Sequence, residues 1–195
     1  MRAGRKAMLG AAAAVWLLAA PVWAQGQQAG QQVSDKNAIP VTGDEKAFLD
    51  WIHHVNQEEI KTGQLAQQKA VSRESADFGA MLVRDHQAAD EKLMAYAKQR
   101  GWNLGNWQPS GELERRIQAS EEADAAKLRS MDGLPFEQTF FSGMVGDHDI
   151  VLGRIKVGAQ KFPKSAEVVN GIVPKLESHR NEAYRILGTR RTSAS

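Results

Sequence analysis

Residues 78–97 read FGAMLVRDHQAADEKLMAYA, and this stretch places a histidine in a row of small and apolar residues. Gly79, Leu82, His86, Ala89 and Leu93 follow one another at steps of three or four, so they share one face of a helix. Such a face is normally buried against other helices. The stretch therefore predicts a helix that carries His86 into a core.

Three further segments repeat this pattern, each with one polar group that can bind a metal ion or a proton. These groups are Glu59 in 42–71, His148 in 135–161 and His179 in 165–187. Short connections near Ser72 and Pro163 favour antiparallel neighbours. Counted from the turn near Ser72, Glu59 and His86 lie at nearly the same level. Counted from the turn near Pro163, so do His148 and His179. We therefore expect each of two hairpins to bring its polar groups face to face.

The predicted fold class is all-α, because no period-two pattern and no hairpin turn sequence occurs. We expect a four-helix bundle with an additional short helix, 110–131, between the two hairpins. Leu113, Ile117 and Leu128 belong to the thin apolar stripe of this short helix, so it should lie across the bundle surface or cap one end. Pro174 should kink the last helix, because proline removes a backbone hydrogen bond.

The first 24 residues are typical of an export signal. Arg2, Arg5 and Lys6 precede an apolar run that is short for a membrane span, and a small-residue cleavage site ends at Ala24. Removing the three basic residues of this segment leaves 22 basic against 23 acidic residues, a net charge of −1. We therefore expect an exported, periplasmic protein without a transmembrane segment after cleavage, possible association with the cell envelope, and no nucleic-acid partner.

Four parts of the chain are expected. They are a signal peptide at 1–24, a flexible Gln/Gly-rich leader at 25–41, the helical bundle at 42–188 and a disordered tail at 189–195. The leader has too few apolar residues to order itself. The sequence contains no cysteine, so disulfides and thiolate metal sites are excluded.

The four polar groups on the helix faces allow two interpretations. Glu59, His86, His148 and His179 could bind a single transition-metal ion, such as zinc, copper or iron, with Asp85 and Asp147 orienting the rings. Alternatively, they form a buried hydrogen-bond network that only fixes the packing of the helices. A ferritin-type di-iron centre needs Glu-x-x-His, and the residue three before His86, His148 and His179 is apolar in each case, so that centre is not expected.

Several motifs resemble a known bacterial exported family, domain of unknown function 4142. They are Phe48, Glu59-Ile60, Gly63–Ala66, Met81–His86, Phe136, Met144–His148 and Pro174–His179. The resemblance covers about Asp44 to Leu187. It implies a ferritin-like helical bundle and carries the family's acidic and histidine positions onto the residues named above, but it implies no established activity.

The sequence thus predicts an exported helical-bundle protein whose role is open. The leading hypothesis is a metal- or small-ligand-binding protein, and the alternative is a non-catalytic structural or interaction module of the cell envelope. Whether it is an enzyme stays undecided. A metal site predicts that the three imidazoles approach one point. A structural network predicts separate pairs, Glu59 with His86 and His148 with His179.

Overall fold

The computed structural model describes residues 40–192, which form helices and connecting loops without any strand. The helices are α2 (Glu45–Lys69), α3 (Arg73–Gln99), α4 (Glu112–Ser130), α5 (Gly133–Lys161), α6 (Ala166–Asn170) and α7 (Val173–Thr192). The all-α prediction is confirmed. None of the helices in this range combines the length and the apolar character needed to cross a membrane. The predicted signal peptide, nearly all of the predicted leader and the last three residues lie outside the described residues.

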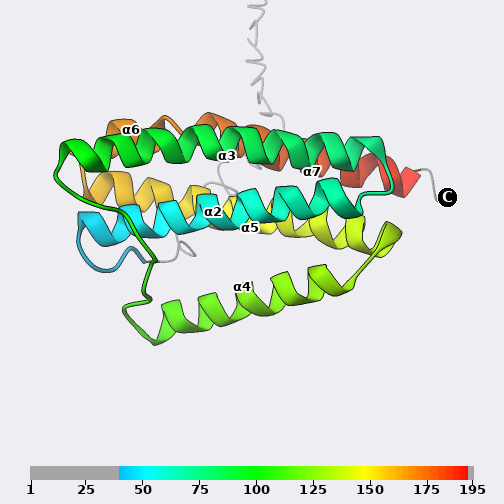
Figure 1. The fold of residues 1–195 in the computed structure, drawn as a ribbon, viewed down its shortest axis with the longest axis horizontal. Helices are drawn as coiled ribbons and strands as arrows, with labels where there is room; N and C mark the ends of the chain where they lie inside the picture. Colours follow the sequence, from blue (N-terminus) through cyan, green and yellow to red (C-terminus); the bar gives the residue numbers. More distant parts are fainter. Residues whose placement is uncertain (1–39, 193–195) are drawn as a thin grey trace, which may run out of the picture. The chain divides into compact units, whose positions relative to one another are not determined.

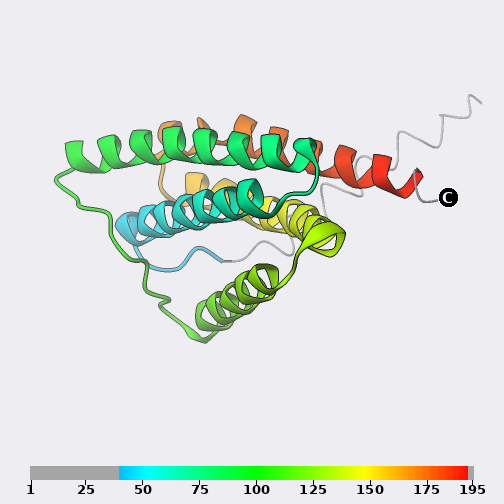
Figure 2. The ribbon, with the colours of Figure 1, turned by 45° about the vertical axis from the view of Figure 1, so that its right-hand side comes forward.

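Two helical hairpins make up the bundle (Figures 1 and 2). One consists of α2 and α3, and the other of α5 packed against α6 and α7. Contacts of α2 with α5 and of α3 with α6 join the hairpins. The last helix continues to Thr192, a turn beyond the predicted end near Leu187. Within the described residues, the architecture is the predicted four-helix bundle with an additional helix, α4, between the hairpins.

Local sequence explains where the hairpin helices begin. Ser72 caps α3, because its side chain accepts a hydrogen bond from the Ser75 backbone N–H. Asp44 caps α2 by accepting from the Ala47 N–H. The hydroxyl of Thr42, two residues before this cap, donates to Glu114 of α4 at 2.8 Å.

The predicted kink at Pro174 is a complete break. The helix stops at Asn170 and starts again at Val173, so the expected single helix 165–187 is divided into α6 and α7. Proline has no N–H and its ring clashes with the carbonyl four residues earlier. Pro174 therefore fits in the first turn of α7 but not inside a continuous helix.

Two glycines set the distance between α2 and α3. A Cβ atom on Gly79 would lie 2.6 Å from the Gly63 carbonyl oxygen, and one on Gly63 would lie 2.7 Å from the Gly79 oxygen. The two backbones therefore touch at this level. Side chains of α2 and α3 one and two turns away are brought close together as a result.

The core has two apolar clusters with polar residues between them. Phe48, Ile52 and Leu93 belong to one cluster, and Phe78 and Phe140 to the other. Along α2, α3, α5 and α7, the residues of one cluster precede and those of the other follow the buried polar positions. Those positions are Asn56, Glu59, Asp85, His86, His148 and His179. We call this set the polar layer.

The additional helix, α4, runs beside the bundle and antiparallel to α5 (Figures 1 and 2). Its inner face differs from the predicted apolar stripe, because Leu113 is exposed whereas Glu114 is buried. The reason lies on another helix: Glu114 forms an ion pair with Arg154 of α5, a guanidinium that is itself buried. Leu128 is buried at the other end of α4, in the cluster that contains Phe140.

Candidate metal centre

Three buried histidines from three helices meet in the polar layer. His86 comes from α3, His148 from α5 and His179 from α7, and each is at most 2 % exposed. Their ring centroids are 5.3, 5.4 and 5.8 Å apart. One ring nitrogen of each histidine lies within 4.8 Å of one nitrogen of the other two. The three rings therefore converge on one point instead of forming separate pairs.

An asparagine determines which nitrogen of His86 faces that point. The Nδ1 atom of His86 lies 2.9 Å from Asn56 Oδ1, an acceptor. The amide nitrogen of Asn56 is directed at Asp90, with 3.5 Å between Nδ2 and Oδ1. Because Asn56 accepts from His86, the proton of the neutral ring is on Nδ1. The lone pair of His86 is on Nε2, which is buried and has no hydrogen-bond partner among the described residues.

A carboxylate fixes the orientation of His179. Its Nε2 atom donates to Asp85 Oδ2 at 3.1 Å. Asp85 also accepts from Arg84 Nε at 2.9 Å and lies 3.4 Å from Lys175 Nζ. With its proton on Nε2, His179 presents the Nδ1 lone pair to His148 Nε2, at 3.3 Å. This carboxylate–histidine arrangement is common behind metal-binding imidazoles.

Glu59 lies behind His148 instead of beside His86. Its Oε1 atom is 3.9 Å from His148 Nδ1, and its Oε2 atom has no hydrogen-bond partner among the described residues. His148 Nδ1 also lacks such a partner. Glu59 is therefore adjacent to the group of three histidines but is not one of the converging donors.

Burial keeps the histidines neutral. It lowers the pKa of His148 to about 3, with the charge of His179 adding to the effect. The Met144 carbonyl opposes this pKa shift, although its geometry falls short of a hydrogen bond. Burial also lowers the pKa of His86 well below its ordinary value, and it lowers that of His179 against the opposing hydrogen bond to Asp85. All three rings therefore offer lone pairs at neutral pH.

The two acidic members of the polar layer behave differently. Burial alone would raise the pKa of Asp85, but the hydrogen bonds from His179 and Arg84 hold it below its ordinary value. Burial raises the pKa of Glu59 well above its ordinary value, and the nearby charge of Asp147 adds to this. A negative charge is thus stable at Asp85 and costly at Glu59 unless a cation is near.

The donor set fits a first-row transition-metal ion. Two nitrogens bound to a zinc ion at about 2.0–2.1 Å in tetrahedral geometry stand about 3.3–3.4 Å apart. The 3.3 Å between His148 Nε2 and His179 Nδ1 matches this separation. Imidazole nitrogens suit zinc, copper, nickel or iron, whereas magnesium and calcium take oxygen ligands. An ion would also satisfy the lone pair on His86 Nε2.

The structure separates the six residues of the sequence hypothesis. His86, His148 and His179 converge, and Glu59 lies behind His148. Asp85 orients His179 instead of its neighbour His86, and Asp147 of α5 lies within the influence of the α4 carboxylates Glu121 and Asp124. Adjacent helical residues point about 100° apart, which explains why Asp85 and His86 serve different partners.

Sequence reasoning missed Asn56. Its signal was present, because Ile52, Asn56 and Glu59 are spaced by four and three residues and share a helix face. Asn56 is 2 % exposed, and it links His86 to Asp90 and through Asp90 to His53. This chain of contacts extends from the polar layer to the surface of α2 and holds the His86 ring in one orientation.

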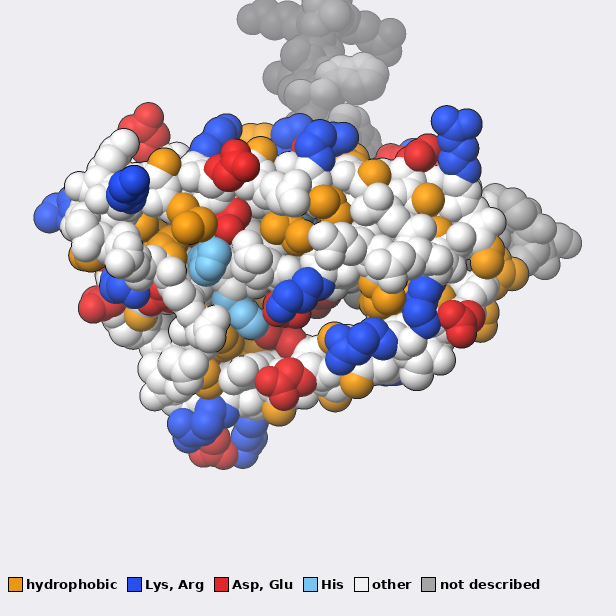
Figure 3. All heavy atoms as spheres, in the orientation of Figure 1, with side chains coloured by type: hydrophobic (Ala, Val, Ile, Leu, Met, Phe, Trp, Pro, Cys, Tyr) orange, Lys and Arg blue, Asp and Glu red, His pale blue; other side chains and the backbone are white. Residues whose placement is uncertain are grey.

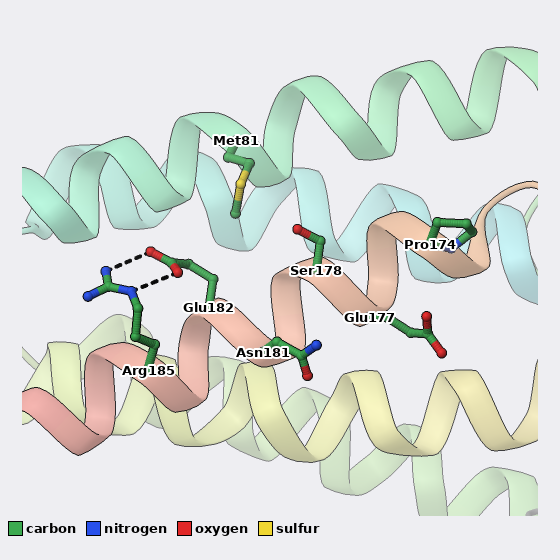
Figure 4. A pocket seen from close by; sticks show the side chains of 7 residues that line it. All are labelled: Met81, Pro174, Glu177, Ser178, Asn181, Glu182 and Arg185. Carbon is green, nitrogen blue, oxygen red and sulfur yellow. Dashed lines mark hydrogen bonds and ion pairs between the residues drawn. The ribbon is translucent and has the colours of Figure 1, made fainter.

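A shallow hollow between α3 and α7 contains none of the converging donors. Figure 4 shows its lining, which includes Met81, Ser178 and the ion pair of Glu182 with Arg185. The hollow is open to solvent and has few apolar groups. It offers a small organic ligand little enclosed surface.

Comparisons with known proteins identify a family and a fold. The family model described as "Domain of unknown function (DUF4142)" matches residues 29–186. A solved structure, "Crystal structure of DUF305 fragment from Deinococcus radiodurans", aligns with a TM-score of 0.66 at 15 % identity, covering 77 % of this chain and 99 % of that one. No curated protein matches the sequence. At this identity the similarity to the solved structure concerns the fold alone.

Proposed function

The chain belongs to the family called domain of unknown function 4142, and we propose that its bundle binds one transition-metal ion through His86, His148 and His179. The observation that carries the proposal is the unpartnered, buried Nε2 atom of His86, which lies in the same layer as two other imidazoles. A buried polar atom without a partner costs about 1–3 kcal/mol. A bound ion would remove this cost.

The proton arrangement favours an ion over a closed hydrogen-bond network. Without an ion, His148 can donate from Nε2 to His179 Nδ1, which joins these two rings but leaves His148 Nδ1 without a partner among the described residues. The same arrangement provides no donor for His86 Nε2. With an ion, three lone pairs have one common partner. The structural alternative of the sequence analysis thus accounts for the contact of His148 with His179 but leaves His86 Nε2 without a partner among the described residues.

Charge also supports the proposal. Three neutral imidazoles leave the charge of a divalent ion unbalanced in a buried layer, where charges need partners. Asp85 supplies a stable negative charge through His179, and Glu59 supplies a second carboxyl beside His148. The proposed role is binding by an exported, periplasmic protein, with the signal at 1–24 directing export.

Zinc titration of the untagged chain tests the proposal. We expect about one equivalent to bind, and His86→Ala, His148→Ala and His179→Ala each to abolish tight binding. The matched control is His54→Ala, because His54 is half-buried on α2 and stacks on Trp107 outside the polar layer. Circular dichroism should show that the variants stay helical. Absence of binding in the wild type, or equal binding by all variants, would refute the proposal and favour the structural alternative.

A further inference from the structure

The middle of α4 is held away from the bundle while both ends are attached. Near its start, Glu114 pairs with buried Arg154 and accepts hydrogen bonds from Thr42 and Ser110. Near its end, Leu128 is buried in an apolar cluster. Between these points the side chains of α4 are exposed or only half-buried. Figure 3 shows an opening between α4 and the rest of the bundle, with both acidic and basic side chains at its edge.

The register of α4 and α5 places two carboxylates opposite each other at this opening. Two helical turns beyond Glu114 lies Glu121, and two turns before Arg154 lies Asp147. Because the helices are antiparallel, these steps lead from an attractive pair to a pair of like charge. The carboxylate of Glu121 faces the bundle, because its Oε2 atom lies 3.8 Å from Nε2 of His54 on α2.

Glu59 connects this acidic opening with the histidines. It is only 7 % exposed, and its Oε2 atom has no hydrogen-bond partner among the described residues. The charges that act on Glu59 are those of Asp147, Glu121 and Glu58, all acidic. Its other oxygen, Oε1, is 3.9 Å from His148. Carboxylates therefore lie both at the surface, on α4, and beside His148, one of the proposed ligands, where Glu59 is found.

The opposite side of the polar layer carries positive charge. There Asp85 is covered by Arg84 and Lys175, whose side chains are 67 % and 61 % exposed. A cation approaching from that side meets these two positive groups, whereas the side under α4 carries Glu121 and, 3.8 Å from it, the half-buried His54.

We propose that the acidic opening under α4 is the route by which a divalent cation reaches the three histidines, with α4 as its cover. This inference rests on the proposed metal site and adds its direction of entry and its selectivity against anions. Carboxylates lining a cleft raise the local concentration of cations and the rate of their association.

The association rate of Zn²⁺ with the full chain, followed by stopped-flow competition with a coloured chelator, tests this route. Glu121→Gln should slow association by about fivefold at low salt, because it removes one charge beside the path. The Co²⁺-bound spectrum should stay unchanged, since Glu121 is not a proposed ligand. The matched control is Glu122→Gln, which removes the same charge from an adjacent exposed position of α4 and should have little effect.

The outcomes are distinct. A slower Glu121→Gln variant whose rate no longer falls steeply with added salt supports the route. Equal rates for Glu121→Gln, Glu122→Gln and the wild type, with stoichiometric binding in all three, would overturn the route but leave the metal site intact. A wild type that binds no Zn²⁺ would refute both, and the titration with the histidine variants identifies that case. Unfolding is not expected to interfere, because Glu121→Gln removes a repulsion.

Discussion

Replacing Asp85 by asparagine should weaken metal binding without removing a ligand. Asp85 accepts from His179 Nε2 at 3.1 Å and fixes the ring so that Nδ1 faces His148. An amide of the same size can still accept this hydrogen bond, but without the negative charge. Loss of such an orienting partner lowers metal affinity about 10- to 100-fold, or about 1.4–2.7 kcal/mol.

The same loss can be followed by thermal unfolding. At a zinc concentration about 100 times the wild-type Kd, binding stabilises the folded state by about 2.7 kcal/mol. For Asp85→Asn at the same concentration, the gain should fall to about 0.4–1.4 kcal/mol. In a domain of this size about 1 kcal/mol corresponds to about 2–4 °C, so the metal-induced rise in Tm should drop severalfold.

Each protein is compared with and without zinc, because Asp85→Asn also removes a charge that stabilises the metal-free fold. Asp149→Asn is the matched control, since Asp149 lies exposed on α5 and pairs with Arg180. The control should keep the full metal-induced shift. If Asp85→Asn retains wild-type affinity while His179→Ala loses it, the orienting role assigned to Asp85 is wrong.

Three other perturbations test the described packing and charges. Arg154→Met should destabilise the fold by about 3–5 kcal/mol in urea unfolding, because Glu114 stays buried without its partner. The double variant that also carries Glu114→Gln should recover most of this stability. Equal stability of the single and the double variant would contradict the pairing. Burial with acidic neighbours raises the pKa of Asp147 to about 6 from 3.8, so its charge costs stability above pH 6 and not below pH 3.8. After discounting for its exposure, Asp147→Asn should stabilise the fold by about 0.5–1 kcal/mol at pH 7–8 and by nothing near pH 4, which melting curves across pH will show. Gly79→Ala should lower Tm, because overpacking against the Gly63 carbonyl costs about 1–3 kcal/mol, which outweighs the higher helix propensity of alanine. An unchanged or raised Tm would refute the tight contact between α2 and α3.

The helical rows could be predicted from spacing alone. Steps of three and four place His86, His148 and His179 on buried faces, and turn positions bring the polar groups of each hairpin to one level. The convergence of His86 with the other two histidines could not be predicted, because it depends on how the two hairpins pack. The partner of Glu59 could not be predicted, because the rotation of α2 against the second hairpin decides whether it meets His86 or His148. That rotation depends on packing between residues far apart in the sequence.

The inner face of α4 illustrates a second limit. Apolar content favoured Leu113 as an inward residue, yet Glu114 is buried because Arg154, 40 positions later, supplies its charge partner. A buried ion pair between distant segments leaves no periodic signal in either segment. The break at Pro174 shows the reverse situation, since its cause is local, but whether a proline kinks or ends a helix depends on what the neighbouring helices stabilise.

The division of the histidines between the two hairpins has a consequence for the order of folding. Each hairpin closes through contacts between neighbouring helices, which form early because little chain entropy is lost. His148 and His179 belong to one hairpin and His86 to the other, so the complete donor set exists only after the hairpins dock. Metal occupancy would therefore mark the last step of assembly, and a chain with two formed but undocked hairpins would be helical by circular dichroism and unable to hold the ion tightly.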